Sequence, residues 1–267
     1  KDYNGAISDY TKAIEINPNY ASAYYGRGIV KDDLKDFNGA IADFTKAIKI
    51  NPNDADAYIN RGSVKDDLKD YYGAISDYTK AIEINPNDAG AYYNRGIVKN
   101  VLKDYNGAIS DYTKAIEINP NYASAYYGRG IVKDDLKDFN GAIADFTKAI
   151  KINPNDADAY INRGSVKDDL KDYYGAISDY TKAIEINPND AGAYYNRGIV
   201  KNVLKDYNGA ISDFTKTIEI NPNYASAYYN RGVCKYYSND SYGACIDAKK
   251  ALDLGYDATQ LMNIVCE

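Results

Sequence analysis

Aspartate is the residue of this sequence whose regular placement could serve acid–base chemistry. Paired carboxylates can act as general acid and base. The same aspartate recurs every 34 residues, however, so no pair is set apart as a catalytic site would be. These aspartates are Asp9, Asp43, Asp77, Asp111, Asp145, Asp179, Asp213 and Asp247. We therefore expect no catalytic residue.

Histidine is absent from the sequence, which removes the commonest general base and the commonest nitrogen ligand of zinc. The three cysteines, Cys234, Cys245 and Cys266, have spacings that match no CxxC metal or redox motif. Cys234 and Cys245 stand where earlier intervals have Val and Ile, so we interpret both as core packing residues. The sequence predicts no enzyme, no metal and no cofactor.

Charge and hydropathy narrow the classes of partner. A net charge of −6 disfavours nucleic acid, whose phosphates call for a surplus of Lys and Arg. No apolar run approaches the roughly 18 residues that span a membrane, so we expect no membrane partner. The residues indicate no compartment beyond a default expectation of the cytoplasm.

The sequence repeats on two scales. All 7 prolines lie 34 residues apart, and residues 1–102 recur identically as residues 103–204. A period of this length predicts stacked supersecondary units, of which none buries its apolar face alone. Length then counts units, and we expect one continuous domain over residues 1–267.

One unit, residues 21–54, contains two helical patterns. Apolar and small residues at helical spacing predict helices over about 21–34 and 37–50. Asp36 can cap the second helix, Asn51-Pro52 ends it, and Asn53 or Asp54 can cap the next helix. The short links predict antiparallel helix hairpins, in which Gly28 lets the helix axes approach closely.

These residues resemble the tetratricopeptide repeat, a family with a 34-residue signature. The signature positions 4, 8, 20, 24, 27 and 32 here read Tyr24, Gly28, Ala40, Phe44, Ala47 and Pro52. The resemblance implies an all-α, right-handed superhelical solenoid of antiparallel helix hairpins. It implies a half repeat over 1–20, full repeats over 21–54, 55–88, 89–122, 123–156, 157–190 and 191–224, a degenerate repeat over 225–258, and a C-terminal capping segment over 259–267.

Two positions depart from the family pattern. Positions 7 and 11 are Arg27 and Lys31 and their equivalents, where the family usually has Leu and Tyr. An Arg in a packed layer needs a partner. We expect each Arg, for example Arg61, to pair with Asp77 of its own repeat or with Asp43 of the preceding one.

The resemblance also implies where a partner would bind. Positions 2, 5, 6, 9, 12 and 13 of the first helix face the concave groove in this family, and asparagine at position 6 often holds an extended peptide there. A carboxamide both donates and accepts hydrogen bonds; alternatively, each asparagine satisfies a neighbouring helix. The position-6 candidates are Asn60, Asn94, Asn162, Asn196 and Asn230.

Tyrosines and acids complete the candidate groove. Tyr25, Tyr93, Tyr127, Tyr195 and Tyr229 at position 5 offer broad contact area, or contact between adjacent first helices. Asp66, Asp67, Asn100 and Asp168 lie at positions 12 and 13. The acids favour a basic or neutral ligand over an acidic one, or are simply a solvated face. An acidic C-terminal tail is disfavoured further, because the Lys and Arg that clamp it in some family members are missing.

Two hypotheses remain from the sequence. The first is a non-catalytic scaffold that binds a peptide or partner protein in the concave groove. The alternative is a structural array that self-associates end to end, since the helix predicted at residues 3–17 has an apolar face without its own hairpin partner.

Overall fold

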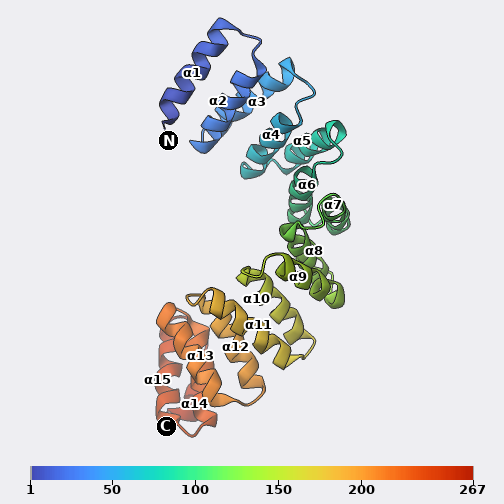
Figure 1. The fold of residues 1–267 in the computed structure, drawn as a ribbon. Coiled ribbons are helices and arrows are strands. Elements are labelled where there is room, and N and C mark those ends of the chain that lie inside the picture. Colours follow the sequence, from blue (N-terminus) through green and yellow to red (C-terminus); the bar gives the residue numbers. More distant parts are fainter. Residues whose placement is uncertain (1, 267) are drawn as a thin grey trace. The chain divides into compact units, whose positions relative to one another are not determined.

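The computed structural model describes residues 2–266, which form sixteen helices (Figure 1). The chain divides into two compact units, one ending at Val132 and the other beginning at Lys133. The single array predicted over residues 1–267 stays a prediction. Lys1 and Glu267, the outer ends of the predicted half repeat and capping segment, lie outside the described residues.

In the first unit, a single helix precedes three complete hairpins. Helices α2 and α3, α4 and α5, and α6 and α7 pack as antiparallel pairs, and α1 packs on α2 (Figure 1). The bounds are α1 Tyr3–Ile16, α2 Ala21–Asp33, α3 Phe37–Ile50, α4 Ala55–Asp67, α5 Tyr71–Ile84, α6 Ala89–Val101 and α7 Tyr105–Ile118. Helix α8, Ala123–Asp135, contains the boundary between the units.

The second unit has the same arrangement and ends in a short helix. Helices α10 and α11, α12 and α13, and α14 and α15 pair, and α16 packs on α15. The bounds are α9 Phe139–Ile152, α10 Ala157–Asp169, α11 Tyr173–Ile186, α12 Ala191–Val203, α13 Tyr207–Ile220, α14 Ala225–Tyr237, α15 Ser241–Asp253 and α16 Thr259–Val265. The predicted all-α fold of antiparallel hairpins is confirmed, and the predicted helices at 21–34 and 37–50 are correct to within one residue.

Aspartates begin the helices, as predicted. The side chain of Asp36 accepts a hydrogen bond from the Gly39 amide at 3.0 Å, and Asp54 accepts from the Ala57 amide at 3.1 Å. A Cβ at position 39 would overlap the Asp36 carboxylate. Glycine in the first turn, which costs helix propensity, therefore makes room for the cap.

The turn inside each hairpin places a lysine in the left-handed region. Lys35 and Lys69 have φ of 63° and 62°. The amide of Asp36 donates to the Lys31 carbonyl, and the amide of Lys35 donates to the Asp32 carbonyl, which closes the first helix in a Schellman motif. This conformation costs a non-glycine residue roughly 1–2 kcal/mol.

Small residues and rings form the core of each hairpin. Ala40, Phe44 and Val64 are fully buried together, and a Cβ added to Gly28 would lie 2.7 Å from the Phe44 ring. The predicted close approach at Gly28 is therefore confirmed. Cys234 takes the valine position of this core, also as predicted, and its burial raises the pKa of the thiol to about 12.

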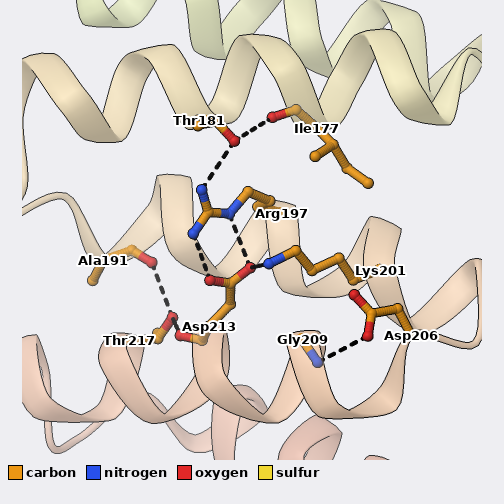
Figure 2. Close-up of polar contacts among 9 residues, drawn as sticks. All are labelled: Ile177, Thr181, Ala191, Arg197, Lys201, Asp206, Gly209, Asp213 and Thr217. Atoms are coloured by element: carbon orange, nitrogen blue, oxygen red, sulfur yellow. Dashed lines mark hydrogen bonds and ion pairs between the residues drawn. The ribbon is translucent and has the colours of Figure 1, made fainter.

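A buried ion network joins the helices and adjacent repeats (Figure 2). Arg197 donates to both carboxylate oxygens of Asp213, and Lys201 pairs with Asp213 at 2.8 Å. The remaining arm of Arg197 donates to the Thr181 hydroxyl of the preceding repeat at 2.9 Å. Equivalent arginine–aspartate pairs occur at Arg27, Arg61, Arg95, Arg163 and Arg231. The predicted pairing is confirmed, with the aspartate of the same repeat as partner.

Candidate binding face on the first helices

Neighbouring first helices contact each other within each unit. Helix α4 contacts α2 and α6 in the first unit, and α10, α12, α14 and α16 contact one another in order in the second. Their positions 2, 5, 6, 9, 12 and 13, most of them at least partly solvent-exposed, form what we call the first-helix face. All fourteen predicted site residues lie on it.

Some position-6 asparagines are held by the preceding repeat. Asn60 Nδ2 donates to the Tyr25 hydroxyl and to the Asp56 carbonyl, each at 2.9 Å. Asn230 makes the same two bonds, to Tyr195 at 3.0 Å and to the Ser226 carbonyl at 2.9 Å. Both amide hydrogens are thereby engaged, and only the carboxamide oxygen remains to accept.

Asn162 is also engaged. Its Nδ2 donates to the Asp158 carbonyl at 2.8 Å. The repeat before it carries Tyr127 at position 5, as the repeats before Asn60 and Asn230 carry tyrosines. These three asparagines therefore follow the alternative interpretation from the sequence, in which a side chain satisfies a neighbouring helix.

Asn94 and Asn196 differ from the other three. Within residues 2–266 neither carboxamide has a hydrogen-bonding partner, and both side chains are half-buried on the first-helix face. The repeats before them carry Ile59 and Ile161 at position 5, which have no hydroxyl to accept a bond. Donor and acceptor both remain available at these two positions, one in each unit.

The position-5 tyrosines are half-buried and pack against rings of their own hairpins. Tyr25 lies 5.9 Å from Phe44, and Tyr195 lies 5.7 Å from Phe214, between ring centroids. Tyr93 lies 5.9 Å from Tyr112. Burial raises the pKa of Tyr25, which keeps its hydroxyl protonated and able to accept from Asn60. Tyr127 and Tyr229 are also half-buried.

The acids of the face are only partly solvated. Burial, followed by the neighbouring charge of Asp67, raises the pKa of Asp66, and Asp168 is raised in the same way by burial and by Asp169. One oxygen of Asp32, at the same position of the preceding repeat, is buried without a hydrogen-bond partner among residues 2–266. Asn100 is half-buried at the equivalent position of α6.

Surface cavities are found at two kinds of place. Four cavities of about 350–450 Å³ repeat along the chain beside the ion network, for example between Tyr58, Arg61 and Lys80, and contain no predicted site residue. A smaller cavity of about 170 Å³ lies between α14 and α16 and includes Tyr229. Within residues 2–266, no cluster of acids or cysteines is placed to hold a metal ion, and no helix is long and apolar enough to cross a bilayer.

The interpretation of Cys245 as a core packing residue is wrong. Cys245 of α15 forms a disulfide with Cys266, the residue after α16. The sequence shows the position of Cys245 in a hairpin, but it does not show that the short helix folds back beside it. Sequence reasoning also missed Gln260 and Ile264 of α16, which lie with Tyr229 around the smaller cavity.

Six segments of the chain match the sequence profile of the tetratricopeptide repeat, and residues 1–31 match a second profile, described as TPR repeat. The six segments are residues 21–54, 55–88, 89–122, 123–156, 157–190 and 191–224. Among curated proteins, no sequence matches the chain.

Solved structures similar to this one are repeat proteins. YrrB, a TPR protein with an unusual peptide-binding site, is 29% identical, with a TM-score of 0.63 over 70% of this chain and 96% of YrrB. MamA is 28% identical, with a TM-score of 0.59 over 64% of this chain and 94% of MamA. A tetratricopeptide repeat protein from Parabacteroides merdae is 20% identical, with a TM-score of 0.66 over 92% of this chain and 99% of that one, and shows likeness of fold alone.

Proposed function

We propose that this chain, which belongs to the tetratricopeptide repeat family and is a protein–protein interaction scaffold, binds an extended peptide segment of its partner on the first-helix face. The tetratricopeptide repeat is generally a non-enzymatic scaffold fold. YrrB, one of the similar structures, has a peptide-binding site, which supports a peptide as the ligand here.

The free carboxamides of Asn94 and Asn196 carry the proposal. A side chain that offers a donor and an acceptor can hold a peptide backbone without reading its side chains. Leaving such a group without a partner when a ligand covers it would cost roughly 1–3 kcal/mol, so a ligand on this face would have to bond it. Asn60, Asn162 and Asn230 would contribute as acceptors only.

The acids set the charge of the ligand. Asp66 with Asp67, and Asp168 with Asp169, place pairs of carboxylates on the face, and their mutual repulsion is relieved by a cation. The unpartnered oxygen of Asp32 offers a further acceptor. The ligand is therefore a basic or neutral segment.

Matched asparagine variants test the proposal. A phage-displayed library of random linear peptides is selected on the wild-type protein, and the enriched peptides are measured against two double variants. Asn94→Ala with Asn196→Ala should weaken binding about tenfold or more, as for loss of a buried hydrogen-bond partner. Asn60→Ala with Asn230→Ala should weaken it less. Failure of the library to yield binders, or equal affinity of all three proteins, would count against the first-helix face.

End-to-end self-association is a second candidate, supported by α1. No residue of α1 is fully buried, and the side chain of Ile16 is 86% exposed. Such a surface can pack against another chain. Light scattering would detect growth of mass with concentration, and Ile16→Asp should suppress it; a constant monomer mass at high concentration would exclude this function.

A further inference from the structure

The cavity between α14 and α16 continues the first-helix face to its last helix. It is lined mainly by Tyr229, Val233, Tyr236 and Tyr237 of α14 and by Gln260 and Ile264 of α16. Helix α16 contacts α14 as α14 contacts α12, so α16 stands where a further first helix would stand. In that register Gln260 and Ile264 occupy positions 2 and 6, which are positions of the first-helix face.

The cavity arises from a change in the tyrosine–asparagine pairs. Tyr25 and Asn60 are 35 residues apart, as are Tyr195 and Asn230. Tyr229 and Ile264 have the same separation, but isoleucine cannot donate to the tyrosine hydroxyl. The Tyr229 ring instead packs 4.9 Å from Tyr256. An apolar hollow therefore replaces the polar link between the two helices.

The residues around the cavity specify the chemistry of its occupant. No charged side chain lines it, so a charged group would lose hydration there without gaining a counter-ion. Tyr237 is 58% exposed and Ile264 is 52% exposed, which leaves apolar surface for an occupant to cover. A volume of about 170 Å³ is below that of sites for drug-sized ligands and suits one side chain.

We propose that this cavity binds a single aromatic or aliphatic side chain of the peptide segment held on the first-helix face. The inference rests on the proposed function and adds an anchor with a fixed place in the partner. Within the second unit, Asp168 and Asp169 lie on α10 and the cavity lies between α14 and α16. The partner segment therefore carries a Lys or Arg for the acids and an uncharged apolar residue for the cavity, separated along its length. Charge complementarity excludes an acidic residue from both places.

A pair of matched isoleucine variants tests the anchor in the full chain. Peptides enriched from the random library should carry an aromatic or aliphatic residue, and Ile264→Asp should weaken their binding about tenfold or more, as loss of a central apolar anchor does. Ile246→Asp is the control, because Ile246 is 50% exposed on α15 and does not line the cavity. Its effect should be small. Tyr236→Ala, on α14, repeats the test in case Ile264→Asp detaches α16.

The outcomes separate the anchor from the first-helix face. Peptides that lose affinity with Asn94→Ala and Asn196→Ala, yet bind Ile264→Asp and Tyr236→Ala as tightly as wild type, would overturn the anchor and leave the proposed function intact. A library that yields no binder would overturn the proposed function and the anchor with it. Enriched peptides with an acidic residue at the position sensitive to Ile264→Asp would overturn the anchor alone.

Discussion

Arg197 grips Asp213 with two parallel hydrogen bonds, from Nε at 2.9 Å and from Nη2 at 2.7 Å, and the Asp213 side chain is 4% exposed. Bidentate geometry of this kind is strong and directional. It is also costly to break from one side, because the carboxylate stays buried when its partner is removed. The pair therefore makes a sharp test of what holds each hairpin together.

Replacing Arg197 by methionine should destabilise the protein by about 3 kcal/mol, since Asp213 would keep only Lys201 as a partner. Urea unfolding followed by circular dichroism measures the change. The double variant Arg197→Met, Asp213→Leu should recover most of the loss, because no charge is then left unpaired. Lys216→Met is the control, since Lys216 forms an exposed pair with Glu219 and its loss should change little. Equal effects of Arg197→Met and Lys216→Met would contradict the assignment of the network as structural.

Replacing Lys69 by glycine should stabilise the chain by about 0.5–1 kcal/mol. Lys69 has φ of 62°, and glycine removes the steric cost of that conformation, although part of the gain is offset by the freedom of glycine in the unfolded chain. Lys69→Ala keeps a Cβ and removes the charge, so it should give no stabilisation. Thermal unfolding of the two variants beside wild type decides between a backbone effect and a charge effect.

Lowering the pH should weaken binding of a basic peptide at higher pH than an ordinary aspartate would allow. The pKa of Asp66 and of Asp168 is raised by burial, so these groups take up a proton before solvated carboxylates do and lose their attraction for Lys or Arg. Their effect on folding has the opposite sign. A raised folded pKa means that the native state binds the proton more tightly, so the penalty of the charged form is present at neutral pH and is relieved as the pH falls through that pKa. Carbon-detected NMR titration of the carboxyl groups, with Asp66→Asn as a control, measures both; a normal pKa at Asp66 would contradict this.

Reducing the disulfide between Cys245 and Cys266 should free α16 while the hairpins stay folded. The bridge closes a loop with a sequence separation of 21 residues, for which a loss of roughly 3 kcal/mol is expected, and α16 has only 7 residues of its own. Hydrogen exchange should quicken within residues 259–265 and little elsewhere. The variant Cys245→Ser should behave as the reduced protein does, whereas Cys234→Ser leaves the bridge intact. Unchanged protection of α16 after reduction would show that Leu261 and Val265 hold it without the bridge.

Much of the fold could be predicted because each local signal recurs in register with the others. Asp36, Gly28 and Pro52 mark the start, the contact and the end of helices, and the same marks return every 34 residues. The arginine–aspartate pairs could be predicted as well, since Arg and Asp were the charges that repeated most faithfully. Thr181 was missed as the third member because the contact crosses from one repeat to the next, and a threonine on a helix has no pattern that points to a partner.

The candidate site was predictable only as a stripe. Asn60 and Asn94 hold the same repeat position, and only the residue 35 places before Asn60 and before Asn94, a tyrosine in one case and an isoleucine in the other, separates a bonded carboxamide from a free one. Spacing alone does not reveal that contact, because it depends on how closely two helices approach. The cavity beside Ile264 was unpredictable for a similar reason, since α16 had first to be placed against α14.

The bond from Arg197 to Thr181 has a consequence for how the chain unfolds. Each repeat with this bond is tied to its predecessor by a contact that neither hairpin can make alone, and the next such tie begins one repeat further on. Stability is then a sum of terms within hairpins and terms between nearest neighbours. Cooperativity becomes adjustable one junction at a time: replacing Thr181 by valine weakens a single coupling and leaves the residues of both hairpin cores unchanged. A chain cut in this way energetically, though not covalently, would melt as two shorter blocks.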